Sequence, residues 1–234
     1  MVKKHFKRTD FNDETLKNAD DLENYIKYRA TKPGAEEKYE ENRAYFHNNF
    51  YHYTKLKHIK EILENQSFLL SRCGCTNDPM EKNIVDRDRC FALCFSHGKV
   101  DNIPMWYLYS GVNGKGGSLK LTKGLIYDLV NNATVSLEVN DKSNKKTPDP
   151  IILEKTDYEV ILQDVLYVES NDNFYTANIT YDNYTLKNFN GEEFEKFRER
   201  NSAFLKSAIW HYEKETRLLI KLTGSGKGKL DKLQ

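Results

Sequence analysis

Cysteine, proline and long apolar runs are scarce in this chain of 234 residues, which contains 4 Cys and 5 Pro. Four cysteines are too few for a disulfide scaffold at this length, so we expect them to stay reduced. No run approaches the roughly 18 apolar residues that a membrane-spanning helix needs, and residues 1–11 lack the apolar stretch of a secretory signal. We therefore expect a cytoplasmic protein that does not associate with membranes.

An excess of one charge is also lacking, because 36 Lys and Arg residues face 35 Asp and Glu residues, for a net charge of +1. This balance argues against a uniformly basic nucleic-acid binder. Aromatic residues are plentiful, since 15 Tyr, 12 Phe and 2 Trp supply large rings that a core can bury. The length suits one sizeable domain, or a core with a small appendage, because single domains extend to roughly 250 residues.

The cysteines have spacings that a four-thiolate zinc site could use in principle. They are Cys73, Cys75, Cys90 and Cys94. Each pair already lies where strands and loops are predicted, so the spacing needs no further explanation. We therefore expect no bound metal.

The two ends of the chain differ in character from its middle. Residues 1–46 are rich in charge and have weak helical patterning, interrupted by a Lys-Pro-Gly breaker at 32–34. Their mixed charges favour an N-terminal helical appendage packed on the core over a binding arm. Residues 224–234 are predicted to form a flexible tail, which leaves 47–223 as the core.

Predicted strands and helices follow one another in the core without a regular period. Strands are expected at 50–53, 67–71, 90–96, 118–122, 159–168, 174–180 and 210–220. Helices are expected at 55–65, 103–109, 125–131 and 190–209, and a polar loop at 140–150. Thr54 is predicted to cap the first helix, and Asn190 with Glu193 resembles a capping box. This irregular order favours an α+β fold over a doubly wound sheet.

Two glutamates stand two residues apart in the last predicted strand. Alternate residues of a strand share a face, so Glu213, Glu215 and Arg217 are expected to project together. Carboxylates placed this close repel, and one pKa rises unless a cation such as Arg217 balances them. Such a pair suits acid–base chemistry. A ladder of salt bridges on an exposed edge strand explains the pattern equally well.

Histidine and aromatic residues supply further candidates. His52 lies in an aromatic strand just before a helix, where a side chain can be held at the lip of a cleft. Taken alone, it is more often a packed histidine, and Trp106, Tyr107 and Tyr109 are more often core than a stacking platform. The glycines at 111–117 do not connect a strand to a helix as a nucleotide loop does, so a turn suffices.

Four motifs in order resemble the bacterial family called domain of unknown function 2971, over about residues 50–222. They are Tyr51-His52-Tyr53-Thr54; Asn77-Asp78-Pro79-Met80-Glu81; Pro104-Met105-Trp106 with Tyr109 and Gly114-Lys115-Gly116; and Trp210 with Tyr212-Glu213-Lys214-Glu215 and Arg217. The name of this family gives no activity.

A second resemblance, to another family, does imply an activity. The His-Tyr-Thr strand, the helix after it and Leu-Leu-Ser at 69–71 are similar to the opening of ADP-ribosyltransferase folds, whose split mixed or antiparallel sheet has flanking helices. In the type that modifies DNA, the ordered triad is His, Tyr and Glu, which would be His52, Tyr109 and Glu215 here. The segment Glu213-Lys214-Glu215 resembles the Glu-x-Glu strand of arginine-directed members, in which the second carboxylate is catalytic.

This second resemblance implies a role for each candidate. His52 with Thr54 would contact the ribose of NAD, Tyr109 or Tyr107 would stack on nicotinamide, and Glu215 would bind the ribose hydroxyl. Glu213 would orient or activate the acceptor. Other contacts to NAD would come from Tyr53, Asn77, Asp78 and Arg217.

The implied function is that of an NAD-dependent ADP-ribosyltransferase-like enzyme, in phage defence or as a toxin. It would cleave the nicotinamide glycosidic bond and transfer ADP-ribose to an acceptor, which could be protein, nucleic acid or water. No metal is required. Two alternatives stay open: a non-catalytic module that binds a nucleotide or nucleic acid, and a metal-free ribonuclease with His52 as general base.

Overall fold

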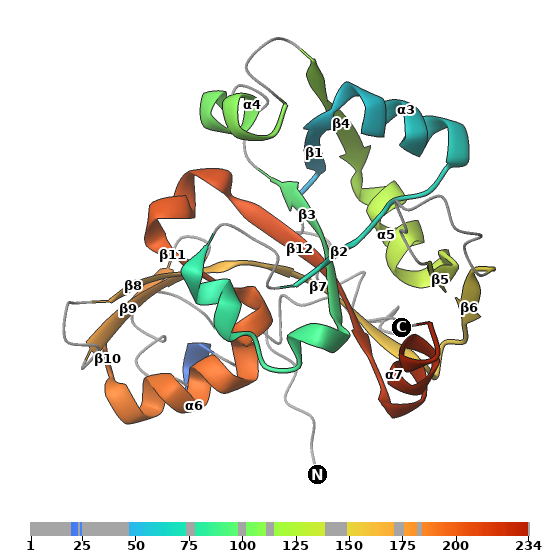
Figure 1. Ribbon diagram of the computed structural model, residues 1–234. Helices are drawn as coiled ribbons and strands as arrows, with labels where there is room; N and C mark the ends of the chain where they lie inside the picture. The colour runs from blue at the N-terminus through green and yellow to red at the C-terminus, as the bar shows by residue number, and fades with distance from the viewer. Residues whose placement is uncertain are drawn as a thin grey trace.

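A mixed α/β arrangement, with largely antiparallel sheets and several helices, is seen in the computed structural model (Figure 1). The structure describes residues 20–22, 24, 47–73, 78–97, 102–110, 115–138, 149–170, 176–181 and 184–233. Within these ranges, no helix is long and apolar enough to cross a membrane. Cys75, Asn77, the glycines at 111–114 and most of the predicted appendage and polar loop lie outside the described residues.

The largest sheet has the strand order β4-β1-β3-β12-β7, with β2 paired to β3, and every pairing in it is antiparallel. Its strands are β1 (Asn49–Lys55), β2 (Ser71–Arg72), β3 (Cys90–Ser96), β4 (Gly116–Thr122), β7 (Tyr158–Asp164) and β12 (Glu215–Leu222). Because β12 lies between β3 and β7, it is an interior strand. This position accounts for its almost continuous burial.

A second sheet has the order β10-β9-β8-β11, and β5 pairs with β6 in a small third sheet. The strands of these sheets are β5 (Val135–Leu137), β6 (Ile151–Leu153), β8 (Leu166–Ser170), β9 (Thr176–Tyr181), β10 (Tyr184–Asn190) and β11 (Leu205–Ser207). The pairing of β11 with β8 is parallel. It brings β11 beside the start of β12, where the candidate site lies (Figure 1).

Helices cover the sheets (Figure 1). The α-helices are α3 (Leu56–Asn65), α4 (Ile103–Tyr109), α5 (Lys123–Asn132), α6 (Gly191–Asn201) and α7 (Gly224–Asp231). Short 3-10 helices are η2 (Pro79–Asn83), η3 (Arg87–Arg89), η4 (Ser202–Phe204) and η5 (Ala208–Glu213). Asn102 caps α4 by accepting a hydrogen bond from the Met105 N–H, and Pro104 occupies its first turn, where a missing N–H costs nothing.

Two apolar cores form on the two faces of the largest sheet. One contains Leu219 and extends to Phe197 of α6 and Leu166 of β8. The other contains Leu218 and extends to Ile126 of α5 and to α7. A fully buried aliphatic or phenyl side chain stabilises the fold by about 1.5–3 kcal/mol, so these cores hold the strands of the site rigidly.

Several predicted elements are confirmed. The strand over 90–96 and the helix over 103–109 have the predicted bounds. The predicted strands at 50–53 and 118–122 and the helix at 125–131 are present with slightly longer bounds.

Other predicted bounds are wrong. The predicted strand at 159–168 is two strands, because Val165 separates β7 from β8 and the chain moves to the second sheet. Only Ser71 of the run 67–71 lies in a strand. Thr54 belongs to β1 and does not cap α3, whose N-cap is Lys55, without a side-chain hydrogen bond.

The C-terminal part differs most from its prediction. The helix expected over 190–209 ends at Asn201, and Leu205–Ser207 is a strand because it pairs with β8. The strand expected at 210–220 begins only at Glu215, because residues 208–213 form η5. The expected flexible tail is mostly helix α7, which buries Leu230 in the core beside Leu222.

Candidate active site

A cavity of about 290 Å³ lies against the face of the largest sheet that carries Tyr51 and Glu215. Both residues pair with Ser96 of β3, so the three side chains share one face. Helix α4 and η5 contribute Tyr109 and Trp210 to its walls. The Asn102 amide donates to the Tyr212 carbonyl oxygen (2.5 Å) and ties these two segments together.

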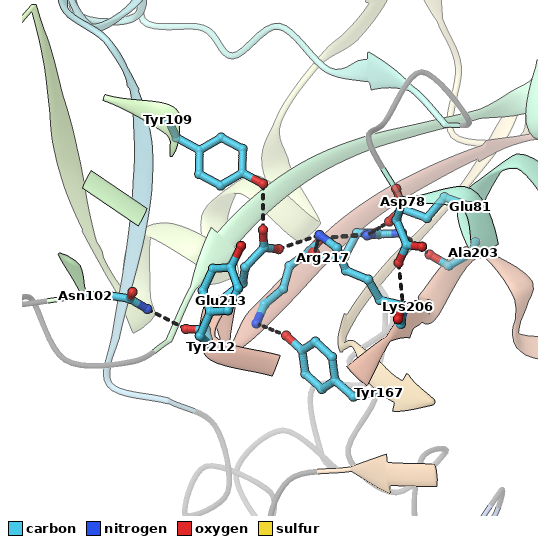
Figure 2. A network of polar contacts seen from close by, with 12 residues as sticks. Asp78, Glu81, Asn102, Tyr109, Tyr167, Ala203, Lys206, Tyr212, Glu213 and Arg217 are labelled. Carbon is cyan, nitrogen blue, oxygen red and sulfur yellow. Dashed lines mark hydrogen bonds and ion pairs between the residues drawn. The ribbon is translucent and has the colours of Figure 1, made fainter. Parts of the chain in front are cut away.

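Lys206 of β11 joins two carboxylates in this cavity (Figure 2). Its Nζ donates to Glu213 Oε2, and it donates to Glu215 Oε2 at 3.0 Å. Lys206 is only 7% exposed, and both glutamates are buried. Burial alone would lower the pKa of Lys206, but Glu215 and Glu213 outweigh it and raise this pKa above its usual value. The ammonium group therefore stays charged.

Arg217 of β12 supplies the second cation. Its Nε donates to Glu215 Oε1 (2.8 Å), and its two terminal nitrogens donate to Glu81 Oε1 and to the Ala203 carbonyl oxygen. Each nitrogen atom of the guanidinium thus has a protein partner. Arg217 is placed to hold Glu215 ionised.

Glu215 is the carboxylate that stays ionised. Burial raises its pKa, but the charges of Arg217 and Lys206 outweigh burial and lower it to about 2. Its backbone N–H donates to the Tyr167 hydroxyl oxygen at 2.8 Å, which anchors the start of β12 to β8. Glu215 is therefore a fixed negative charge in a water-poor site.

Glu213 has the opposite environment. The Tyr109 hydroxyl donates to its Oε1 at 2.6 Å. Burial raises the pKa of Glu213, while Lys206 and Tyr109 counteract part of that rise. Burial and the negative charge of Glu213 raise the pKa of Tyr109, so its phenol stays protonated and donates. Of the two carboxyl groups, Glu213 thus holds a proton more tightly than Glu215 does.

The two carboxylates meet through a bend and not through an unbroken strand. Glu213 ends η5, and Lys214 adopts left-handed backbone angles, φ 44° and ψ 56°. The bend brings Glu213 and Glu215 to the same lysine, Lys206. The prediction that both glutamates project from one strand is wrong, because only Glu215 lies in β12. An edge-strand ladder is excluded as the explanation, because β12 is an interior strand.

Cys94 adds a neutral donor to Glu215. Burial, then the nearby Glu215, raises its pKa well above the usual value, so the thiol stays protonated beside the carboxylate. Its surface is open to the cavity, although protein atoms surround it on most sides.

Two more acidic residues border the cavity. Asp78 accepts from the Met80 N–H (2.9 Å) and the Ser207 N–H (2.7 Å), so it joins η2 to β11. Glu81 holds Arg217 through one oxygen. Its other oxygen and the Trp210 indole nitrogen are buried without a hydrogen-bond partner among the described residues. Unsatisfied buried polar atoms are rare, and these two border the same cavity.

His52 borders the cavity, but its ring lies on the opposite face of the sheet from the Glu215 side chain. It follows Tyr51 in β1, so its side chain points to the opposite face of the sheet. The ring packs edge-on against Phe68 and Phe95, with centroids 5.9 and 6.1 Å apart, and its Nδ1 lies 3.0 Å from the Cys94 carbonyl oxygen. Burial lowers its pKa.

The other predicted contacts are divided between the cavity and its surroundings. Tyr53 and Tyr109 line it, and Tyr53 packs edge-on against Trp106 with centroids 5.2 Å apart. Thr54 alternates with Tyr53 and does not line the cavity, and Tyr107 is 63% exposed. Tyr109 is therefore the tyrosine of the pair that belongs to this site.

Lys206, Glu81 and Trp210 have no role in the sequence prediction. Lys206 was not recognised because a helix was expected over 190–209, and in that helix it would be an ordinary surface lysine. The carboxylate pair itself was the available signal, because two buried acids need a nearby cation. Glu81 and Trp210 do occur in the motifs of the first resemblance, without an assigned role.

Comparisons of this chain with family models, with curated proteins and with solved structures found no match. The two family resemblances of the sequence therefore stay predictions.

Proposed function

We propose that this protein cleaves the nicotinamide glycosidic bond of NAD and passes ADP-ribose to an acceptor. The observation that carries the proposal is the pair Glu213 and Glu215, which share Lys206 yet have pKa values displaced in opposite directions. Two carboxyl groups in one site with separated pKa values are the usual equipment for glycosidic bond cleavage.

Glu215 would stabilise the transition state. As the bond between ribose C1′ and the nicotinamide nitrogen breaks, its electron pair leaves with nicotinamide, and positive charge develops on the ribose. A carboxylate fixed by Arg217 and Lys206 needs no reorganisation to stabilise that charge. Nicotinamide leaves as a neutral molecule, so this departure requires no acid.

Glu213 would serve the acceptor. A nucleophilic oxygen or nitrogen of the acceptor forms the new bond to C1′, and its proton passes to Glu213 as general base. A base works best when its pKa lies near the working pH, and burial moves Glu213 in that direction. Tyr109 holds Glu213 through one hydrogen bond and acts as a positioning residue.

The size and lining of the cavity favour one end of a dinucleotide. Its volume of about 290 Å³ lies just below the range of roughly 300–1,000 Å³ that is usual for ligand pockets, so it suits a part of the dinucleotide and not the whole. Tyr51, Tyr53, Tyr109 and Trp210 supply aromatic surface for a planar ring. The cavity is lined by four carboxyl groups and three Lys and Arg side chains. This excess of acidic groups suits the cationic nicotinamide ring. The negatively charged diphosphate would therefore lie outside the cavity.

Nicotinamide release from NAD by the purified protein, with cell extract as a source of acceptor, tests the proposal. We expect release by the wild type and none by Glu215→Gln. The matched control is Glu159→Gln, because Glu159 is an exposed glutamate on β7 outside the cavity. Circular dichroism and thermal unfolding verify that the variants fold. Release by a folded Glu215→Gln at the wild-type rate would remove the proposed role.

A further inference from the structure

A second polar cluster lies away from the cavity. His47 Nε2 is 2.9 Å from Asp164 Oδ2, and His97 Nδ1 is 3.7 Å from Asp164 Oδ1. One nitrogen from each ring and one carboxylate oxygen all lie within 4.8 Å of one another. Thr216 touches both Asp164 and His97 through its hydroxyl.

The hydrogen bonds of this cluster fix where its protons are. Thr216 Oγ1 lies 2.6 Å from Asp164 Oδ1 and must donate its single proton, because a carboxylate only accepts. His97 Nδ1, 2.9 Å from the same hydroxyl, is then the donor in that contact. His47 likewise donates from Nε2 to Asp164. The ring nitrogens that face the carboxylate therefore carry protons.

We propose that His47, His97 and Asp164 bind a divalent transition-metal ion of the zinc type. Two imidazoles and one carboxylate form a donor set that suits such ions and not calcium or magnesium, which prefer oxygen ligands alone. Three protein ligands leave a coordination position open for water or a small ligand. This site is independent of the cavity and of the function proposed for it.

The strands hold the ligands in place. Asp164 ends β7 and faces Thr216 of β12 directly across the antiparallel pair. His97 follows β3, and its backbone N–H donates to the Lys214 carbonyl oxygen at 2.9 Å. Thr216 hydrogen-bonds to two of the ligands and so orients both, as residues next to metal ligands commonly do.

Binding would reorganise the histidine rings. They are stacked, with centroids 3.6 Å apart and planes 1° from parallel. Nitrogen lone pairs lie in the ring planes, so an ion shared by both requires the rings to turn out of this stack. His47 and His97 are 21% and 16% exposed, so they border solvent on one side. The protons on the facing nitrogens move to the other ring nitrogen or are released.

The histidine cluster and Glu215 lie on opposite faces of the largest sheet. Thr216 follows Glu215 in β12, so their side chains point to opposite faces of the sheet. The Val165 N–H donates to the Glu215 carbonyl oxygen at 2.9 Å. An ion on Asp164 would therefore fix the end of β7 that pairs with the start of β12, and Glu215 projects from that start.

Cobalt(II) binding to the full chain, first stripped with a chelator, tests the site. Calorimetry and visible absorption should both report one ion bound by the wild type. We expect His97→Ala and His47→Ala each to weaken binding by roughly tenfold or more, since even residues that only orient ligands change metal affinity about 10–100-fold. The matched control is His58→Ala, because His58 pairs with Glu61 on α3 outside the cluster.

Two further readouts separate this site from other causes. Binding by the cysteine thiolates would produce sulfur-to-metal charge-transfer absorption, which imidazole and carboxylate ligands do not. Thr216→Val should keep all three ligands yet bind roughly 10–100-fold more weakly. In proton NMR, zinc should shift the signals of His47 and His97 as their stack opens. No uptake by the wild type, or equal uptake by the wild type and both histidine variants, would overturn the site.

Discussion

At the scale of single residues, the candidate site depends on one lysine. Lys206 approaches both Glu213 and Glu215, and Arg217 binds only the second of them. The unequal supply of positive charge therefore separates the two pKa values, although both carboxyls are buried. A pair with two equal partners would lack this difference.

Acid should weaken the fold through Glu215. Its pKa is about 2 in the folded protein against an ordinary value of 4.5, so the folded state holds this proton less tightly than the unfolded state. The stabilisation is fully present above pH 4.5 and is lost as the pH falls toward 2, on the order of 3 kcal/mol in total.

Urea unfolding of the wild type and Glu215→Gln, repeated between pH 7 and pH 2, measures this contribution. The free energies of unfolding of the two proteins should converge as the pH falls. A difference between them that stays constant over the whole range would show that Glu215 titrates normally.

Tyr109 should set the pH at which Glu213 works. Its hydrogen bond favours the ionised carboxylate, so Tyr109→Phe raises the pKa of Glu213 further. A general base is inactive when protonated, and the acid limb of kcat should therefore move to higher pH in this variant. Tyr107→Phe is the matched control, because Tyr107 is exposed. An unmoved acid limb in Tyr109→Phe would assign the proton transfer to another group.

At the scale of elements, patterning predicts strands and helices best where one face is consistently apolar. The strand over 90–96 and the helix over 103–109 satisfy that condition, and their bounds are confirmed. Leu205–Ser207 is too short for its own pattern, and its identity as a strand depends on pairing with β8, far away in the sequence. Propensity cannot report such a partner.

Helix α7 shows the same limit and supplies a test of its own. Three glycines in its sequence favour a flexible tail by propensity. A Cβ on Gly226 would lie 2.1 Å from the Asp157 carbonyl oxygen, whereas a Cβ on Gly228 would have no heavy atom within 4 Å. Gly226 therefore permits the close approach of α7 to the core.

Alanine at these two glycines should have opposite effects. Gly226→Ala should destabilise the protein by about 1–3 kcal/mol, because the clash forces the helix away from Asp157. Gly228→Ala should be neutral or stabilise it by up to about 1 kcal/mol, since alanine favours a helix. Chemical denaturation measures both. Equal effects of the two substitutions would mean that α7 does not pack as described.

At the scale of the whole molecule, one interior strand contributes side chains to both proposed sites. β12 directs Glu215 and Arg217 toward the cavity, and Thr216 toward the histidine cluster. The sequence alone predicted the α+β class and the shared face of Glu215 and Arg217, because strand alternation is local information. Its placement of Glu213 in the same strand was wrong, since Glu213 ends η5 and reaches Lys206 through the bend at Lys214. It missed Lys206 and the pairing of His47 with Asp164, since contacts between distant segments arise only from the tertiary fold.

Nicotinamide release from NAD by the wild type, Glu215→Gln and Glu213→Gln, measured side by side with cell extract present, tests the central claim most directly. The account predicts release by the wild type, none by Glu215→Gln, and a loss of roughly 10²–10⁴-fold in acceptor-dependent transfer for Glu213→Gln, as expected for a general base. Wild-type protein that neither releases nicotinamide nor binds NAD in calorimetry would contradict it.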